Sequence, residues 1–281
     1  WIVLRGNHEL CDRGGHGFFL LLDPRPLPSN WTGDYCLDYT EAYGVPFAQE
    51  QFIVLDDSAI WDLSIDHVCP SGPSTQTDAW PASRYDDPQQ SPEEIAKQIA
   101  YFAEQFRKVA AIALPGRTNI LANHRPLLGV ACHQGKYFAV DWTLQQALQN
   151  DTLSSISATI HGHVHWFQGL VYKNNALPVE IVVGNGGTDL DPHKMANATA
   201  IEGLHVRGVP VKRAFTSNSF GYSILRRTLG GDYLLQAFEV ERDRNKASRA
   251  KPDKLMWSTL IPAGARRYEG HRAVPPLQVV V

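Results

Sequence analysis

The chain has 281 residues, 43% of them hydrophobic, and a formal net charge of -3 at pH 7. This length fits one large domain or two modest ones, with enough apolar residues for a substantial core. A charge this close to zero creates no long-range positive field, so we expect no nucleic-acid-binding patch. The longest run of large apolar residues, at positions 18–22, is far shorter than the roughly 20 residues that cross a bilayer, so we expect no membrane span.

The sequence begins inside an apolar run rather than with a Met, a charged leader or a cleavage-site pattern. We interpret residues 1–5 as a buried strand that ends at Gly6. A start of this kind indicates that sequence upstream of Trp1 is missing, so the chain is expected to be a fragment.

The four cysteines are widely spaced and include no C-x-x-C pair, which argues against a zinc knuckle or a thioredoxin-type site. They are Cys11, Cys36, Cys69 and Cys132. An even count permits one or two disulfides, and Cys11 with Cys36 is the preferred pair because both follow the first strand in a loop-rich stretch. Scattered buried thiols are the alternative.

Further along the chain, the segment 23–46 is rich in Pro, Gly, Asp and Tyr, which predicts a long surface excursion. The apolar run 51–55 predicts a central strand, and a second irregular stretch covers 69–90. Long irregular segments often carry the residues that select a ligand.

The clearest helix begins at Ser91, which forms a capping box with Glu94 and is followed by Pro92 in the first turn. Apolar residues then recur at spacings of four, three, four and three, which predicts one apolar stripe packed on a sheet. They are Ile95, Ile99, Phe102, Phe106 and Val109. Pro115 and Gly116 end the helix.

Beyond this helix, strand patterns at 119–122, 156–160 and 179–183 alternate with a helical pattern at 140–148. The alternation predicts an α/β sandwich. The β-type runs 220–226 and 232–240 predict a hairpin that closes the sheet. We therefore place one domain at 1–241, followed by a basic loop and C-terminal tail at 242–281.

Three short polar clusters each follow a predicted strand: G-N-H-E at 6–9, N-H-R-P at 123–126 and H-G-H-V-H at 161–165. Ligand sites in open α/β sheets lie at the carboxyl ends of strands, so one sheet edge can gather all three clusters. Neutral imidazoles and an amide oxygen suit Zn, Fe, Mn or Co, whereas Ca and Mg prefer oxygen ligands. Together the clusters indicate a transition-metal site, although a single histidine after a strand is usually a hydrogen-bonded loop residue.

The order G-N-H-E, then N-H with a following Pro, then G-H-x-H resembles the later motifs of the calcineurin-like metallophosphoesterases. The match runs from Gly6 to His165, and the V-G-N-G-G-T segment at 183–188 also looks similar to bacterial and acid-phosphatase-like members. The resemblance implies a four-layer α/β/β/α fold, a β-sandwich flanked by helices, lacking its first strand–helix units.

The resemblance also implies roles for single residues. Asn7, His124 and His163 match ligands of the second of two transition-metal ions, and His165 matches a ligand of the first. In this family a hydroxide bridging the two cations attacks phosphorus in line with the leaving group. His8 matches the general acid, a task that suits imidazole because its pKa lies near neutrality. The implied function is hydrolysis of a phosphate ester, of small-molecule or macromolecular origin.

The D-x-H and G-D-x-x-D motifs that open the family's pattern do not precede Gly6. The second metal would then be held loosely, the first hardly at all, and no bridging ligand remains. We therefore expect this chain alone to be weak or inactive. A non-catalytic binding protein of the same fold is the alternative, and a structural domain with incidental histidines is a third interpretation.

Several assignments stay open at this point. Arg125 can reach a substrate phosphate through its forked guanidinium, or form a surface ion pair. His161 can orient the neighbouring imidazoles, or be an ordinary strand residue. Glu9 is expected to hold its turn rather than a metal. An exported protein, periplasmic or secreted, is favoured by the Cys11 to Cys36 pairing, with the cytoplasm as the alternative.

Overall fold

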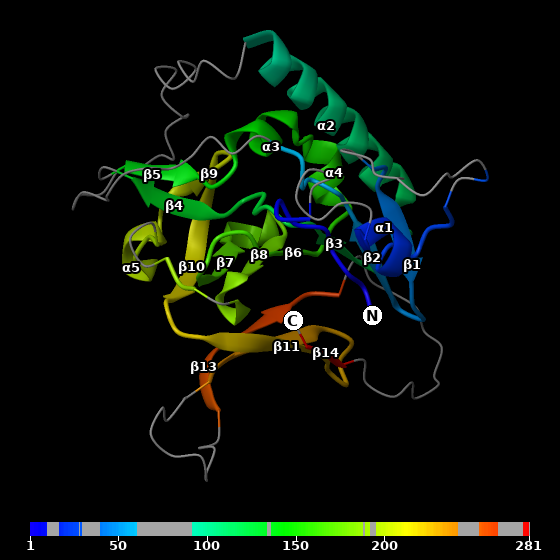
Figure 1. Cartoon of the computed structure of the whole chain (residues 1–281). Helices are drawn as coiled ribbons and strands as arrows, with labels where there is room; N and C mark the ends of the chain where they lie inside the picture. Colours follow the sequence, from blue (N-terminus) through cyan, green and yellow to red (C-terminus); the bar gives the residue numbers. More distant parts are fainter. Residues whose placement is uncertain are drawn as a thin grey trace.

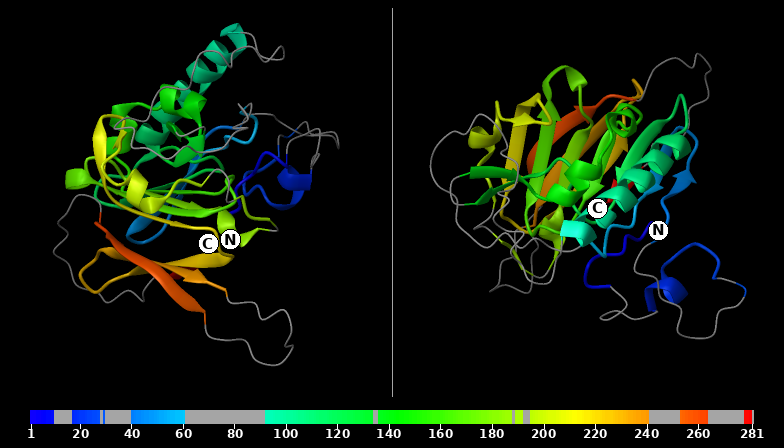
Figure 2. Two further views of the ribbon diagram at one scale, coloured as in Figure 1. Left: turned by 90° about the vertical axis from the view of Figure 1, so that its left-hand side faces the viewer. Right: turned by 90° about the horizontal axis from the view of Figure 1, so that it is seen from above.

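The computed structural model describes residues 1–9, 17–27, 29, 40–60, 92–133, 136–187, 189–191, 195–240, 253–263 and 278–280. Two β-sheets pack face to face, and helices cover the outer face of the larger sheet (Figures 1 and 2). The layers are stacked in the order helices, larger sheet, smaller sheet. The α/β sandwich predicted from the sequence is therefore present.

The larger sheet has eight strands within the described residues. In spatial order they are β1 (Tyr43–Pro46), β2 (Glu50–Val54), β3 (Thr118–Ala122), β6 (Ala158–His161), β8 (Val179–Val183), β7 (Phe167–Tyr172), β10 (Val209–Ser217) and β9 (His205–Val206). The central four, β2, β3, β6 and β8, pair in parallel, and the outer pairings are antiparallel. The C-terminal ends of the parallel strands therefore share one edge.

The parallel strands are short apolar runs because both of their faces are covered. Every residue of β2, β3 and β6 is buried. Backbone bonds continue the ladder past the strand ends, from Leu55 N to Ala122 O at 3.0 Å and from Asn123 N to Ile160 O at 3.2 Å. The residues that follow each strand thus leave the sheet side by side.

The smaller sheet is antiparallel, in the order β13 (Lys254–Ile261), β12 (Tyr233–Glu239), β11 (Gly221–Arg227) and β14 (Gln278–Val280). Its inner face meets the larger sheet in one apolar core. The core includes Phe52, Ile120, Ile160, Phe167 and Ile181 from the larger sheet, and Leu225, Tyr233, Leu235, Trp257 and Ile261 from the smaller. On β13, Leu255 and Leu260 face outward and are exposed.

The helical layer forms a second core on the other face of the larger sheet. It contains α2 (Pro92–Ile112), α3 (Trp142–Ala147) and α4 (Asn150–Ser154), beside the two-stranded ribbon β4 (Val130–His133) and β5 (Lys136–Ala139). Short elements complete the described chain: α1 (Gly17–Leu21), α5 (Ala198–Ile201), η2 (Lys173–Asn175) and η3 (Gly184–Gly186). Among the described helices, none is long and apolar enough to span a bilayer.

Most predicted elements are confirmed. Helix α2 begins at the expected Pro92, and four stripe residues, Ile95, Phe102, Phe106 and Val109, are buried. The strand predictions at 51–55, 119–122, 156–160 and 179–183 correspond to β2, β3, β6 and β8, and the helical pattern at 140–148 contains α3. The predicted hairpin is β11 and β12, but it builds the smaller sheet rather than closing the larger one. Ser91 lies outside the described residues.

Three other predictions need correction. Residues 1–5 form no strand, although Ile2 and Leu4 pack against the sandwich core, because an apolar pattern reports burial rather than pairing. The excursion 23–46 ends in strand β1. The stretch 242–281, interpreted as a loop and tail, contributes β13 and β14 to the smaller sheet. A helical layer outside the smaller sheet is not among the described elements.

Of the four cysteines, Cys132 is described, and it is disulfide-bonded. It lies in β4 and is buried. The alternative of scattered free thiols is therefore wrong for this residue. The preferred pair, Cys11 with Cys36, lies outside the described residues, as does Cys69.

The close packing of the two sheets yields a prediction about Gly169 in β7. A Cβ built on Gly169 overlaps the indole ring of Trp257 in β13. We expect Gly169→Ala to lower the free energy of unfolding by about 1–3 kcal/mol, the usual cost of overpacking. Denaturant unfolding measures this loss.

The matched control is Gly17→Ala, since a Cβ at Gly17 meets no atom within 4 Å. A second variant, Gly169→Ala with Trp257→Leu, tests the mechanism because the smaller side chain leaves room for the new methyl group. Additive losses in the double variant would contradict the proposed clash.

Candidate functional site

Three side chains from separate segments meet at the C-terminal edge of the parallel strands. His124 follows β3, His163 follows β6, and Asn7 lies in the N-terminal segment, residues 1–9. The Nε2 atom of His124 is 2.9 Å from Asn7 Oδ1 and 3.2 Å from His163 Nδ1. The two imidazole rings meet edge to face with their centroids 5.0 Å apart. The structure thus brings together three of the four side chains that the sequence assigned to metal ions.

The turn that carries Asn7 depends on Gly6 and Glu9. Gly6 N donates a hydrogen bond to Glu9 Oε2 at 2.9 Å, and Glu9 N donates to Gly6 O at 3.1 Å. A Cβ on Gly6 would lie 2.8 Å from Glu9 Oε2 and 3.0 Å from His124 Cε1, closer than ordinary packing allows. Glycine at this position therefore lets the turn approach His124, and Glu9 holds the turn as expected.

The loop after β6 is bent rather than extended. His163 has φ 65°, in the left-handed region that residues with a Cβ seldom adopt. Val164 N donates to Gly162 O, and Trp166 N donates to Val164 O, both at 2.8 Å. His163 and His165 therefore do not follow the side-chain alternation of an extended segment, because these turns break it.

The remaining predicted residues lie apart from this group. His8 and His165 are exposed. Asp191 N donates to the backbone oxygen of His165 at 3.1 Å. Within the part of the chain that the structure describes, no hydrogen bond or ring contact is found between the imidazoles of His8 or His165 and the three clustered side chains. Their roles remain predictions.

The clustered atoms suit a cation. Asn7 Oδ1 and the facing imidazole nitrogens of His124 and His163 each offer a lone pair when the imidazoles are neutral and suitably protonated. Two ligands at right angles on a transition metal, with bonds of about 2.1 Å, lie about 3 Å apart. The separations of 2.9 and 3.2 Å match this arrangement. No group of three or more His, Cys, Asp or Glu among the described residues is placed to share a metal ion, so such a site relies on an amide oxygen beside two imidazoles.

Arg125 is a buried side chain that contacts His163, one of the three clustered residues. Its side chain is 2% exposed, with Nη1 3.2 Å from His163 Nε2 and Nη2 donating to Ile60 O at 2.8 Å. Asp141 Oδ2 lies 3.6 Å from Nη1. The ion pair that we considered for Arg125 is therefore present, but it is buried rather than at the surface. Phosphate binding by Arg125 remains a prediction, and in this structure the guanidinium contacts His163.

His161 belongs to a different, fully buried network. Its Nε2 lies 3.2 Å from Glu180 Oε2, and neither side chain is exposed. Glu180 also accepts from Thr159 Oγ1 at 2.5 Å and from Leu128 N at 3.0 Å. The sequence held a signal for this network that we did not use, since Glu180 is a charged residue inside the apolar strand V-E-I-V-V.

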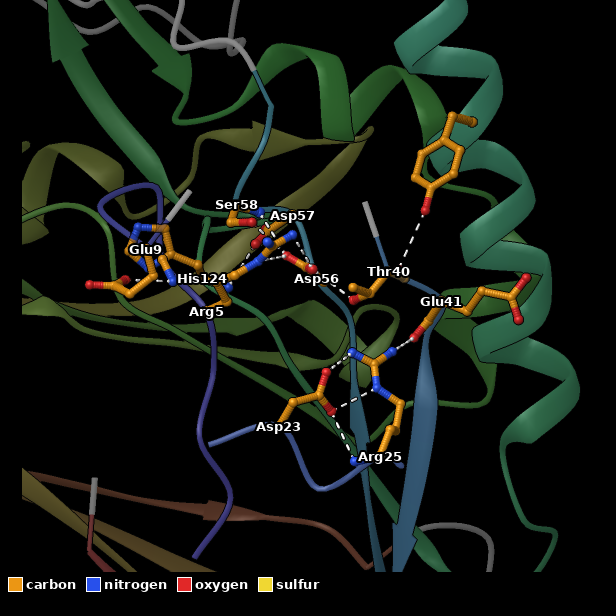
Figure 3. Close-up of polar contacts among 12 residues, drawn as sticks. Arg5, Glu9, Asp23, Arg25, Thr40, Glu41, Asp56, Asp57, Ser58 and His124 are labelled. Carbon is orange, nitrogen blue, oxygen red and sulfur yellow. Dashed lines mark hydrogen bonds and ion pairs between the residues drawn. The ribbon is translucent and has the colours of Figure 1, made fainter. Parts of the chain in front are cut away.

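Asp57, which follows β2, is a second residue that the sequence interpretation missed. Its carboxylate accepts from His124 N and Arg125 N at 2.9 Å each, and from Asn123 Nδ2 at 2.5 Å. Burial of this side chain raises its pKa from an ordinary value of 3.8 to about 6, against the opposing effect of the Asn123 hydrogen bond. Figure 3 shows Asp57 beside Asp56 and His124. The sequence feature that could have identified Asp57 is its position directly after a predicted strand, as for the histidine clusters.

Comparison with known proteins gives a distant structural likeness. No family model matches the chain, and no curated protein matches it. Among solved structures, it is similar to the purple acid phosphatase PPD1 from yellow lupin (Lupinus luteus) seeds, at 14% sequence identity and a TM-score of 0.42. The match covers 78% of this chain and 32% of that chain, so this chain spans about a third of the phosphatase's length.

The raised pKa of Asp57 predicts how stability depends on pH. The folded chain holds the Asp57 proton up to about pH 6, whereas an unfolded chain releases it near the ordinary value of 3.8. Because the folded state binds more protons in this window, the contribution of Asp57 to stability falls as pH rises from about 4 to about 6. The loss is on the order of 2–3 kcal/mol.

Urea unfolding of the metal-free protein at several pH values measures this slope. The Asp57→Asn variant cannot titrate, so its stability relative to the wild type should rise across the same pH window. If the difference in the free energy of unfolding between the two proteins stays constant from pH 4 to pH 6, the pKa of Asp57 is not raised in the folded chain.

The Arg125 contact predicts the tautomer of His163. A guanidinium N–H can only donate, so His163 Nε2 must accept and the neutral ring carries its proton on Nδ1. Long-range proton–nitrogen NMR of the metal-free protein should show this Nδ1–H form. We expect Zn²⁺ to shift the proton to Nε2 and so to break the Arg125 contact, since a metal ligand needs a free lone pair on Nδ1 and two N–H donors cannot bond to each other. An Nε2–H ring before metal addition would contradict the Arg125 contact.

Proposed function

We propose that the chain is a metal-dependent hydrolase of phosphate esters. The observation that carries this proposal is the convergence of Asn7 Oδ1, His124 Nε2 and His163 Nδ1 within hydrogen-bond distance at one sheet edge. These three ligands are neutral, so a bound divalent cation keeps its full positive charge for an anionic substrate. The cation would be a transition metal, Mn, Fe, Zn or Co, since two of the three ligands are imidazoles.

The chemistry divides between the metal and the chain. Bound cations polarise phosphoryl oxygens and activate water as the nucleophile. Asn7, His124 and His163 hold the cation, and His8 protonates the leaving-group oxygen. His8 suits this role because it is exposed to solvent and follows Asn7 directly in the turn. A second cation, if bound, would use His165, and Arg125 would add positive charge behind His163.

A second candidate function is a non-catalytic binding protein with the same fold. The observation that favours it is the lack of a carboxylate cluster, since the described residues hold no group of three or more His, Cys, Asp or Glu that could share a metal ion. A two-cation centre usually needs a bridging ligand, and the nearby Asp56 and Asp57 are already saturated with hydrogen bonds. Under either function the same three side chains, Asn7, His124 and His163, would bind the cation. The two functions therefore differ only in whether the chain hydrolyses a phosphate ester.

The test combines metal binding with turnover of phenyl phosphate and a phenyl phosphate diester. We expect Mn²⁺ or Zn²⁺ to bind the purified chain by calorimetry, and metal-dependent turnover to be low because the described residues supply few ligands. His163→Ala should abolish binding and turnover. The matched control is His205→Ala, in strand β9 at the far edge of the larger sheet.

Each possible outcome has a distinct meaning. Metal binding without turnover of either ester supports the non-catalytic binding protein. Equal metal content in wild type and His163→Ala would show that the histidines are incidental and would overturn both candidates. His8→Ala should lower turnover without changing metal affinity, and a parallel loss of both would contradict its role as general acid.

A further inference from the structure

Two of the candidate metal ligands, Asn7 and His124, come from segments that no sheet ladder joins, whereas β3 and β6 pair just before His124 and His163. His124 lies in the loop after β3, whereas Asn7 lies in the N-terminal segment, which forms no strand. Yet their side chains meet with 2.9 Å between Asn7 Oδ1 and His124 Nε2. Two consecutive buried carboxylates, Asp56 and Asp57 after β2, bind one segment each (Figure 3).

Asp56 binds the N-terminal segment. Its Oδ2 accepts from Arg5 Nη2 at 2.7 Å and its Oδ1 from Arg5 Nε at 3.3 Å, a forked pair with both side chains buried. Thr40 Oγ1 donates to Asp56 Oδ2 at 2.6 Å, and Ser58 Oγ donates to Oδ1 at 2.7 Å. The Arg5 guanidinium also lies over the ring of Phe19, 5.0 Å from its centroid. Arg5 is thus fixed from several sides, two residues before Asn7.

Asp57 binds the loop after β3, which carries His124. It is fully buried, and its two oxygens accept the backbone N–H groups of His124 and Arg125 and the side-chain amide of Asn123. The His124 backbone is thereby fixed to the end of β2.

We propose that Asp56 and Asp57 are positioning residues that set the distance between Asn7 and His124 and so control the affinity of the site for a cation. This inference rests on the proposed function, because it concerns the same ligands. Neither carboxylate contacts the cation. Each acts through the segment it holds, as the hydrogen-bonded groups around metal ligands generally do.

Two variants remove the contacts of Asp57 and of Asp56 separately, and we call them the anchor variants. Asp57→Asn keeps the size of the side chain but replaces one acceptor oxygen with a donor that faces backbone N–H groups. Arg5→Gln combined with Asp56→Asn replaces the ion pair by two amides, so no unpaired charge is left buried. This paired variant keeps the proposal testable should Asp57→Asn fail to fold.

The matched control is Glu50→Gln, at the opposite end of the same strand. Glu50 is 4% exposed and accepts a hydrogen bond from Tyr233 OH. Its loss removes a buried carboxylate from β2 without touching either segment of the site. A general loss of stability in β2 would therefore affect all three variants, whereas a positioning effect would spare Glu50→Gln.

The first readout is titration with Co²⁺, followed by visible absorption. We expect about tenfold or greater weakening of Co²⁺ binding in Asp57→Asn and in the paired variant, the usual effect of removing a group that orients a ligand. Glu50→Gln should stay within about threefold of wild type, since it is remote from the site. Wild-type affinity in both anchor variants, or an equal loss in Glu50→Gln, would overturn the proposal.

The second readout needs no metal. A nuclear Overhauser effect between the Asn7 side-chain amide and the His124 ring should be present in wild type and Glu50→Gln and absent in the anchor variants. If wild type binds no Co²⁺, the proposed function fails while this measurement still judges the positioning role. Persistence of the effect in both folded anchor variants would overturn it.

Discussion

Parallel pairing of the central strands is the constraint on which the rest of the molecule depends. The register aligns Val54 of β2 with Ala122 of β3, and Ala122 with Ile160 of β6. Because parallel strands run in one direction, the chain leaves all of them at the same edge. In the candidate site, His124 and His163 lie just beyond that edge, and Asn7 is held against His124. The helical layer and the smaller sheet contribute by burying both faces, without which a parallel sheet of this kind is not stable.

Buried polar side chains, together with the backbone bonds that extend the ladder, hold the connections that follow these strands. Asp57 binds the loop after β3, and Glu180 binds Leu128 N a few residues later. Gln168 then binds both N and O of Val130, at 2.8 and 2.9 Å. Each contact satisfies backbone groups that would otherwise be buried without partners, at a cost of about 1–3 kcal/mol apiece. The loop that carries His124 is consequently held by hydrogen bonds from buried side chains along its length.

The sequence predicted the elements whose own pattern is strong, such as α2 with its apolar stripe, and it predicted that Asn7, His124 and His163 would share one edge. Strand β13 was missed because its pattern follows a basic stretch, and its identity as a strand depends on pairing with β12. Strand β1 was missed for a similar reason, within an irregular, Pro- and Gly-rich segment. The Asp57 contacts could not be read from the chain, since they join residues 66 to 68 positions apart. The bend at His163 also escaped prediction, because nothing in H-G-H-V-H distinguishes a turn from an extended run.

That bend has a consequence for protein engineering. A residue with a Cβ in the left-handed conformation costs about 1–2 kcal/mol, a penalty from which glycine is exempt. Selection of variants for thermal tolerance alone would therefore favour glycine at position 163 and delete the imidazole. Directed evolution of a more robust version of this chain should screen for cation binding alongside heat resistance, since the two goals conflict at this one backbone angle.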